Sequence, residues 1–198
     1  MGFHNKTVLI TGGASGIGFL TGKCFAQDGA NVALIDIDEN CLEKALAELR
    51  EISDLVIGFK ADVRDYSRAE EVVAETVAAF GSIDVLVACA GGAETRIIQG
   101  GAFHELPISV VDWGIDVNLK GALYYDHVVM KQMVTQQNGV IINLGSITGL
   151  DGAYDALAYS ASKSALMNGV VKALAQYGQY YNIRSVCIAP GPVLTRPG

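Results

Sequence analysis

The sequence has few charged residues and no concentrated positive charge. Charged side chains make up 18% of its 198 residues, with 14 Lys and Arg against 21 Asp and Glu and a formal net charge of −7. This balance, without a basic cluster, argues against a general nucleic-acid-binding protein. Apolar residues make up 51% of the chain, which excludes intrinsic disorder, and the 23 glycines follow no period of three, which excludes collagen.

Cysteine, histidine and long apolar segments are also scarce. The four cysteines, Cys24, Cys41, Cys89 and Cys187, form no CxxC pair, so we expect neither a zinc cluster nor a disulfide framework. The three histidines share no ligand spacing, and we expect no metal site. No apolar run approaches the roughly 18 residues of a transmembrane helix, and no signal-peptide core follows the N-terminus. We therefore predict a cytoplasmic protein that binds neither membranes nor nucleic acids.

Short apolar runs alternate with helical patterns along the whole chain. The predicted strands cover residues 7–11, 31–36, 55–60, 85–88, 140–144 and 183–189. The predicted helices cover residues 16–28, 39–52, 67–80, 110–136 (as one helix or two) and 156–181. This alternation predicts an α/β fold with a Rossmann-like, doubly wound parallel sheet, in a single domain over residues 1–198. Ligands of such sheets bind outside the carboxyl ends of the strands.

A glycine-rich turn follows the first predicted strand and opens the first predicted helix. It reads Thr11-Gly12-Gly13-Ala14-Ser15-Gly16-Ile17-Gly18. Glycines allow the backbone to approach a pyrophosphate closely, and the helix N-terminus offers N–H groups and a positive dipole end. A tight structural turn would also explain glycines alone. The residues of this turn that we expect to bind a dinucleotide are Gly12, Ser15, Gly16, Ile17 and Gly18.

Asp36 ends the second predicted strand, where a carboxylate can accept hydrogen bonds from the hydroxyls of an adenosine ribose. It could instead cap the next helix together with Asp38. A carboxylate repels the 2′-phosphate of NADP, and neither Ser15 nor Ile37 offers a cation to neutralise that phosphate. We therefore predict NAD rather than NADP. The turn lacks the GK[ST] of a P-loop, so we do not expect nucleoside triphosphate hydrolysis.

Tyr159 and Lys163 place a phenol and an ammonium group four residues apart in a predicted helix, which puts them on one face. A cation near a phenol lowers the phenol pKa from about 10 and makes it a usable acid and base for carbonyl and alcohol chemistry. A solvated helix face would account for the pair equally well by itself. Two further residues favour chemistry, because Ser146 follows the strand 140–144 and Asn118 lies in the long helix 110–136.

Together, the TGxxxGxG turn and the residues Asn118, Ser146, Tyr159 and Lys163 resemble, in order and spacing, the short-chain dehydrogenase/reductase family over the whole chain. The resemblance implies that Tyr159 exchanges a proton with the substrate, while Lys163 favours the ionised phenol and holds the nicotinamide ribose. It implies that Ser146 hydrogen-bonds the substrate oxygen. It also implies that Asn118 kinks its helix and supports a proton-relay water. Hydride transfer would belong to the cofactor.

The same resemblance implies further cofactor contacts after three other strands. Asp62 and Val63 would meet the adenine, and Ala90 and Gly91 would pass under the cofactor. A segment after the last strand would face the nicotinamide, and the contacts expected from it are Pro190, Gly191, Val193 and Thr195. The two long helices would pair with those of other subunits in a homodimer or homotetramer.

The sequence departs from the family pattern at three places. Ala88-Cys89-Ala90-Gly91 stands where the family usually has Asn-Asn-Ala-Gly, so an amide is lost and we expect Cys89 to be a packing substitute. Gly145 stands before Ser146, where a second serine is common. The sequence ends at Gly198, so we expect the usual C-terminal strand and substrate-loop helix to be absent from it.

These observations predict an NAD-dependent oxidoreductase that acts on a secondary alcohol or a ketone. One alternative is a 3-oxoacyl thioester reductase, which would need a basic entrance, with Arg96 and Arg196 as the candidates. Another alternative is a dinucleotide-binding protein without turnover. The sequence does not identify the substrate, and we expect residues 92–107 and 148–154 to select it. We also expect Asp155 to cap the helix that carries Tyr159.

Overall fold

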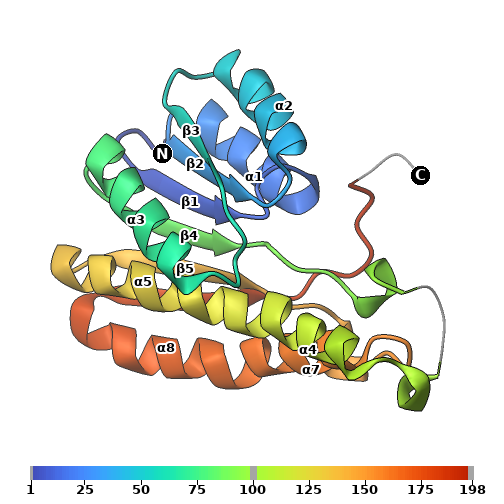
Figure 1. Ribbon diagram of the computed structural model, residues 1–198. Coiled ribbons are helices and arrows are strands. Elements are labelled where there is room, and N and C mark those ends of the chain that lie inside the picture. Colours follow the sequence, from blue (N-terminus) through green and yellow to red (C-terminus); the bar gives the residue numbers. More distant parts are fainter. Residues whose placement is uncertain (1, 99–101, 196–198) are drawn as a thin grey trace.

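The described part of the chain forms one six-stranded parallel sheet. A computed structural model describes residues 2–98 and 102–195. The strands are β1 (Thr7–Thr11), β2 (Asn31–Asp36), β3 (Val56–Lys60), β4 (Val85–Ala88), β5 (Gly139–Leu144) and β6 (Ile183–Ile188). Their order across the sheet is β3-β2-β1-β4-β5-β6, with every neighbouring pair parallel (Figure 1). The predicted α/β, Rossmann-like, doubly wound sheet is confirmed, and its order reverses between β1 and β4, where such sheets bind ligands.

Helices cover both faces of the central strands. They are α1 (Gly16–Gln27), α2 (Glu39–Arg50), α3 (Tyr66–Phe80), α4 (Ile108–Ile115), α5 (Gly121–Gln136), α6 (Thr148–Asp151), α7 (Leu157–Ala165) and α8 (Val171–Gly178). Because alternate strand residues point to opposite faces, Leu9 and Leu86 pack with α3 and α5, whereas Ile10 and Val87 pack with α1 and α2. Among the described residues, no helix is long and apolar enough to cross a membrane.

The edge strand β6 is less covered than its apolar run predicts. Burial along it alternates, and Val186 and Ile188 are 44% and 51% exposed. Helix α8 packs against this strand. At the edge of the sheet, within the described residues, the face that carries Val186 and Ile188 stays open. An almost wholly apolar strand of a doubly wound sheet is usually buried on both faces, and within the described residues β6 departs from this.

Each of the two long predicted helices contains one wider turn with π geometry. Residues Asp116–Lys120 separate α4 from α5, and residues Leu166–Val170 separate α7 from α8. In the first turn, Asn118 Nδ2 donates to the Gly114 carbonyl at 2.8 Å. A regular helix would bond that carbonyl to the backbone N–H of residue 118, so the inserted side chain disturbs the ladder. The structure thus has a π turn at Asn118, where the resemblance implies a kink.

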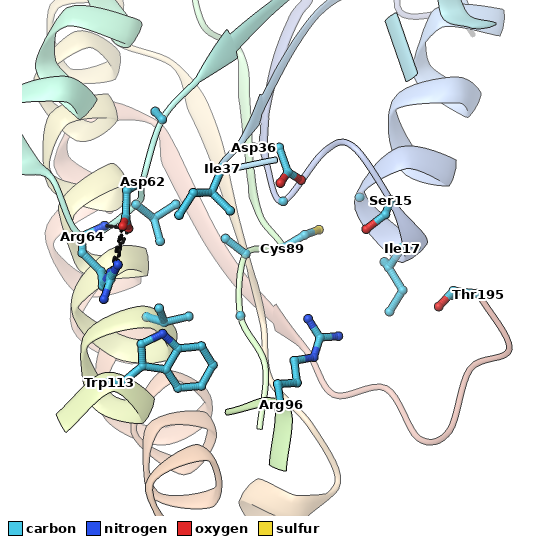
Figure 2. Close-up of a pocket in the computed structure, with 18 residues that line it drawn as sticks. Ser15, Ile17, Asp36, Ile37, Asp62, Arg64, Cys89, Arg96, Trp113 and Thr195 are labelled. Atoms are coloured by element: carbon cyan, nitrogen blue, oxygen red, sulfur yellow. Dashed lines mark hydrogen bonds and ion pairs between the residues drawn. The ribbon is translucent and has the colours of Figure 1, made fainter. Parts of the chain in front are cut away.

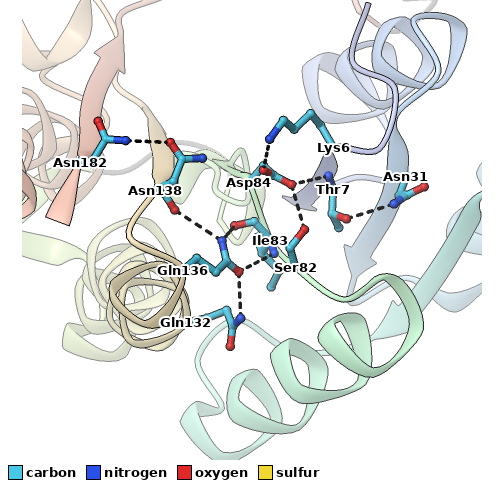
Figure 3. A network of polar contacts seen from close by, with 10 residues as sticks. All are labelled: Lys6, Thr7, Asn31, Ser82, Ile83, Asp84, Gln132, Gln136, Asn138 and Asn182. Atoms are coloured by element: carbon cyan, nitrogen blue, oxygen red, sulfur yellow. Dashed lines mark hydrogen bonds and ion pairs between the residues drawn. The ribbon is translucent and has the colours of Figure 1, made fainter.

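Polar side chains hold the amino ends of β1 and β4 together, at the end of the sheet opposite the ligand edge (Figure 3). Asp84, just before β4, accepts hydrogen bonds from Lys6 Nζ at 2.7 Å, from the Thr7 N–H at 3.0 Å and from Ser82 Oγ at 3.0 Å. Burial acts to raise the pKa of Asp84, but the three donors outweigh it and hold this pKa below its ordinary value. The ionised carboxylate is therefore a structural part of this end of the sheet.

Asp84→Ala is expected to destabilise the fold, because it leaves the N–H of the fully buried Thr7 without its acceptor. Such a loss costs on the order of 2 kcal/mol, and urea unfolding followed by circular dichroism measures it. Glu39→Ala is the control, since it removes an exposed ion pair with Lys60 and is expected to leave the midpoint nearly unchanged. Equal midpoints for the two variants would contradict the role given to Asp84.

Candidate active site

Two cavities adjoin one another at the carboxyl ends of the central strands. The first has a volume of about 350 Å³ and lies over the turn between β1 and α1 (Figure 2). The second has a volume of about 470 Å³ and lies where β5 ends and α7 begins. Ile17, Cys89, Gly91 and Arg96 line both cavities, so the two meet along a shared wall. This is the ligand edge expected of a doubly wound sheet.

All five residues predicted from the glycine-rich turn line the first cavity. A Cβ on Gly12, whose φ is +64°, would lie 2.8 Å from the backbone nitrogen of Ala90, and a Cβ on Gly18 would collide with the Gly12 carbonyl. The missing side chains therefore let the turn after β1 lie close to both the backbone after β4 and the first turn of α1. The first turn of α1 opens on the cavity with N–H groups suited to a pyrophosphate. The residues present fit a dinucleotide cofactor.

Asp36, at the end of β2, lies on the wall of the first cavity beside Ile37 (Figure 2). Its carboxylate accepts hydrogen bonds from the backbone N–H groups of Ala14 at 3.0 Å and Asp38 at 3.1 Å. Asp38, and not Asp36, caps α2 by accepting from the N–H of Cys41. Because a carboxylate offers about four acceptor positions, Asp36 keeps capacity for ribose hydroxyls.

The predicted contacts Asp62, Val63, Ala90 and Gly91 also line the first cavity. Asp62 is already paired, since Arg64 Nε donates to its Oδ1 at 2.9 Å, and this hydrogen bond lowers the pKa of Asp62. The sequence analysis missed several other lining residues, among them Ile37, Arg64, Trp113 and Val117. The first two directly follow predicted contacts, which was a usable signal. The other two reach the cavity from α4 and its π turn, and no local pattern marks them.

Tyr159, Lys163 and Ser146 line the second cavity together. Lys163 is 4% exposed, its Nζ donates to the Leu144 carbonyl at 2.6 Å, and Nζ lies 5.4 Å from the centre of the Tyr159 ring. Burial lowers the pKa of Lys163 to about 8. At neutral pH the ammonium form therefore still predominates, and its charge faces the phenol.

Ser146 is placed to donate a hydrogen bond into the second cavity. Its Oγ accepts hydrogen bonds from the N–H of Thr148 at 3.2 Å and from Thr148 Oγ1 at 2.9 Å. Because both contacts use the Ser146 oxygen as acceptor, its own hydroxyl proton remains for a ligand oxygen. The preceding Gly145 leaves room for Met167, whose Sδ would lie 2.8 Å from a Cβ at that position. A serine in place of Gly145 would not fit without movement.

Asn118 is fully buried and binds the loop after β4. Its Oδ1 accepts from the Gly92 N–H at 3.0 Å, and its Nδ2 donates to the carbonyls of Gly92 at 2.9 Å and Gly114 at 2.8 Å. Both Nδ2 hydrogens are used, so the side chain fixes the loop beside Gly91. The proton-relay water that the resemblance implies stays a prediction.

Cys89 occupies the place of the expected asparagine and packs with the apolar cluster between the sheet and α1. Burial raises the pKa of Cys89 to about 12, so at neutral pH it is an uncharged thiol. Thr11 binds the backbone here, with its carbonyl 3.1 Å from the Cys89 nitrogen and its Oγ1 3.2 Å from the Ala90 nitrogen. This arrangement supports the interpretation of Cys89 as a packing substitute.

The segment after β6 returns to the glycine-rich turn. Pro190, Gly191 and Val193 line the second cavity, and Thr195 lines the first (Figure 2). A Cβ on Gly16 would lie 3.4 Å from Thr195 Oγ1, so this segment passes close to the start of α1. All the cofactor contacts that the resemblance implies after the last strand therefore border one of the two cavities.

Some expectations fall outside the described residues or concern metals. Arg196, one candidate for a basic entrance, lies outside them, as do residues 99–101 of the segment expected to select the substrate. Within residues 2–98 and 102–195, no group of three His, Cys, Asp or Glu side chains is arranged to hold a metal ion.

The start of α7, which carries Tyr159, is capped from a distant loop. Ala156 occupies the N-cap position, and Asp155 makes no hydrogen bond to this helix in the described part of the chain. Glu94 accepts instead, from the N–H of Ala158 at 2.6 Å and from that of Tyr159 at 3.3 Å. The expectation that Asp155 caps this helix is wrong, because the acceptor comes from a residue 64 positions away.

A buried polar pair joins α5 to β5 next to the second cavity. Asn143 Nδ2 donates to both carboxylate oxygens of Asp126, at 3.2 and 3.0 Å. Asn143 Oδ1 is buried and has no hydrogen-bond partner among the described residues. Burial raises the pKa of Asp126 to about 7, against the opposing effect of the Asn143 hydrogen bond. The neighbouring titratable group is Cys187 of β6, whose pKa burial also raises, with a smaller contribution from Asp126.

Comparison with known proteins gives matches over almost the whole chain. A family model described as short chain dehydrogenase matches residues 6–197. The chain is 35% identical over 197 residues to the 3-oxoacyl-[acyl-carrier-protein] reductase FabG of Thermotoga maritima, covering 98% of this chain and 77% of that protein. It is 34% identical over 197 residues to the L-rhamnose 1-dehydrogenase (NAD(P)(+)) of Sphingomonas sp., covering 97% of this chain and 74% of that one.

A solved structure, NAD+-bound xylitol dehydrogenase, superposes on the chain with a TM-score of 0.87 at 32% sequence identity. The match covers 96% of this chain and 71% of that one. The similar proteins thus differ in the substrates that their names give, from a 3-oxoacyl-[acyl-carrier-protein] to L-rhamnose and xylitol.

Asp126→Asn is expected to stabilise the protein at neutral and alkaline pH. Between about pH 4 and pH 7 the folded wild type keeps a proton on Asp126 that the unfolded chain releases, so wild-type stability falls as the pH rises through this window. The asparagine keeps an acceptor for Asn143 Nδ2 and adds a donor for its unpaired Oδ1. The gain at pH 8 is at most about 4 kcal/mol, and it shrinks toward pH 4.

Thermal unfolding of wild type and Asp126→Asn from pH 4 to pH 8 measures this difference. Asp54→Asn, which removes an exposed carboxylate, is the control and is expected to follow the wild-type curve. Parallel curves for wild type and Asp126→Asn across the whole range would exclude a raised Asp126 pKa.

Proposed function

The chain belongs to the short-chain dehydrogenase/reductase family, and from this premise we propose that it is an NAD-dependent oxidoreductase that interconverts a secondary alcohol and a ketone. The observation that carries the proposal is the shared cavity wall. The candidate proton-transfer group, Tyr159 with Lys163, faces a cavity that adjoins the one over the glycine-rich turn. A substrate in the second cavity would therefore lie next to the end of a dinucleotide in the first.

Family members use NAD or NADP, and the charge distribution in the first cavity favours NAD. The Asp36 carboxylate would repel a 2′-phosphate, and its neighbour Ile37 is uncharged. Two arginines also line this cavity, but Arg64 is bound to Asp62, and Arg96 lies at the other end of the cavity from Asp36 (Figure 2). Similarity to a structure named as NAD+-bound supports the same choice.

The side chains of the second cavity supply what proton transfer to a carbonyl oxygen requires. In our proposal the Tyr159 hydroxyl exchanges a proton with the substrate oxygen, and the Lys163 ammonium, 5.4 Å from the ring centre, stabilises negative charge on the phenol. Ser146 donates its hydroxyl proton to the same substrate oxygen. When bound, the nicotinamide of the cofactor supplies or accepts the hydride. Asn118 holds the loop that borders both cavities.

A second substrate class, 3-oxoacyl thioesters, is favoured by one observation. Arg96 lines both cavities and makes no ion pair within the described residues, so its guanidinium is available to a substrate that carries phosphate or carboxylate groups. Similarity to a 3-oxoacyl-[acyl-carrier-protein] reductase agrees with this reading. Binding of a dinucleotide without turnover is the remaining alternative.

The homodimer or homotetramer implied by the family resemblance stays part of the proposal. Apolar and aromatic side chains remain exposed on and after the two long helices, among them Leu123 of α5, Tyr177 of α8 and Tyr180. Such surfaces are suited to burial between subunits.

Replacing Asp36 and Ile37 tests the cofactor preference. Asp36→Ala combined with Ile37→Arg is expected to raise the affinity ratio of NADP to NAD by about 100-fold, because repulsion is removed and a charged donor is added. Fluorescence titration with each cofactor measures the ratio without any substrate. Asp38→Ala, which removes only the cap of α2, is the control and is expected to keep the wild-type ratio. An unchanged ratio in the double variant would refute the role of Asp36.

Tyr159→Phe tests the reaction. It is expected to lower kcat by about 1,000-fold or more, because no other group in the second cavity replaces the phenolic proton, while affinity for NAD stays within threefold. Absorbance of reduced nicotinamide is followed with xylitol, L-rhamnose and cyclohexanol in one direction and acetoacetyl-CoA in the other. Tyr124→Phe, which removes a hydroxyl on α5, is the control. NAD binding without wild-type turnover of any probe would favour the non-catalytic alternative, and an active Tyr159→Phe would refute the role of Tyr159.

A further inference from the structure

Glu94 is a buried carboxylate that caps α7 and has no part in the proposed reaction steps. It opens the short 3₁₀ helix Glu94–Arg96 after β4 and is 2% exposed. It makes no ion pair with a Lys, Arg or His side chain in the described part of the chain. Its hydrogen bonds go to backbone N–H groups at the start of α7, those of Ala158 and Tyr159.

The contact is specific in its geometry. Glu94 Oε1 lies 2.6 Å from the Ala158 nitrogen, and both carboxylate oxygens lie 3.3 Å from the Tyr159 nitrogen. Gly114 of α4 makes room for it, since a Cβ there would lie 3.3 Å from Glu94 Cγ and Cδ and 2.8 Å from Ala158 Cβ. The loop after β4, α4 and α7 therefore meet around this one carboxylate.

A buried carboxylate without a cation is costly, and here the helix end compensates for that cost. The first N–H groups of a helix lack intrahelical partners and carry the positive end of its dipole, which suits an anion. A serine or aspartate at the N-cap position 156 could accept hydrogen bonds from N–H groups in the same first turn. The sequence has Ala156 there and takes the acceptor from the loop after β4 instead. Such an arrangement couples two segments, which a local cap does not do.

The coupled segments are the two sides of the candidate site. Asn118 holds Gly92 by its backbone on one side, and two residues later Glu94 holds the backbone of Tyr159 on the other. Gly91, which borders both cavities, directly precedes the anchored Gly92. The position of the phenol relative to the cofactor cavity is thereby set through Glu94.

We propose that Glu94 is a positioning residue that fixes Tyr159 against the loop under the cofactor cavity by accepting hydrogen bonds from the start of α7. The proposal rests on the function proposed above for Tyr159. A displacement of about 1 Å of a reacting group can lower a rate about 100-fold, whereas binding of NAD at the glycine-rich turn does not depend on α7 in the same way.

The test compares Glu94→Ala, Glu94→Asp and Glu94→Gln with Asp65→Ala, which removes the side-chain cap of another helix, α3. Glu94→Ala is expected to lower kcat between 10- and 100-fold, with KM for NAD within threefold of wild type. Glu94→Asp has a side chain that is shorter by one methylene. Its kcat is expected to lie between that of the wild type and that of Glu94→Ala. Glu94→Gln keeps an oxygen within reach of both N–H groups and is expected to recover kcat to within fivefold. Asp65→Ala is expected to lose stability and keep kcat.

Hydrogen exchange at the Ala158 and Tyr159 amides, read by mass spectrometry of α7 peptides, provides a readout that needs no substrate. At least 10-fold faster exchange in Glu94→Ala, with α3 peptides unchanged, supports the proposal. Wild-type kcat in Glu94→Ala or in Glu94→Asp overturns it, and so does a loss of kcat in Asp65→Ala equal to that in Glu94→Ala. If the wild type turns over no probe, the proposed function fails, and exchange at the wild-type rate in Glu94→Ala then overturns the positioning role separately.

Discussion

The close approach of three backbone segments at Gly12 is the constraint on which the site depends. A side chain at Gly12 would meet the backbone of Ala90, and one at Gly18 would meet Gly12 itself. Without those side chains, β1, the start of α1 and the end of β4 come together where the strand order of the sheet reverses. A cavity lined by backbone forms there, and the wall at Gly91 is thin enough to border the second cavity as well. The position of the first cavity and its border with the second thus depend on one close backbone contact.

The second requirement is a buried cation that keeps its charge. Burial makes the ammonium of Lys163 less stable than in water, yet a pKa of about 8 still leaves it mostly charged at neutral pH. The Leu144 carbonyl, at 2.6 Å, gives that charge one acceptor at the end of β5, next to Ser146. The strand that positions the serine therefore also positions the lysine, and through it the charge that faces Tyr159. The helix α7 sets the spacing between Tyr159 and Lys163, and the hydrogen bond to the end of β5 fixes where the lysine lies.

Local patterns in the sequence predicted what depends on neighbours in the chain. The short apolar strands, the glycine-rich turn and the spacing of Tyr159 and Lys163 are each visible within a few positions, and the predicted doubly wound sheet is present. The features that were missed or wrong depend on contacts between distant elements. Glu94 reaches across 64 residues to cap α7, and Asp126 pairs with Asn143 across 17. Asp155 was the better cap by position alone, and no property of the nearby sequence shows that the loop after β4 takes its place.

The loop after β4 contacts both sides of the candidate site, and its sequence departs there from the family pattern. Cys89 stands in place of an amide, and as a half-buried uncharged thiol it packs against the apolar cluster beside α1. The loop is held on both sides. Asn118 makes two hydrogen bonds to the backbone of Gly92 and one to the Gly114 carbonyl, and Glu94, within the loop, binds the start of α7. The loop is thus held by two elements that carry candidate site residues, so movement of the loop and placement of the phenol are physically linked.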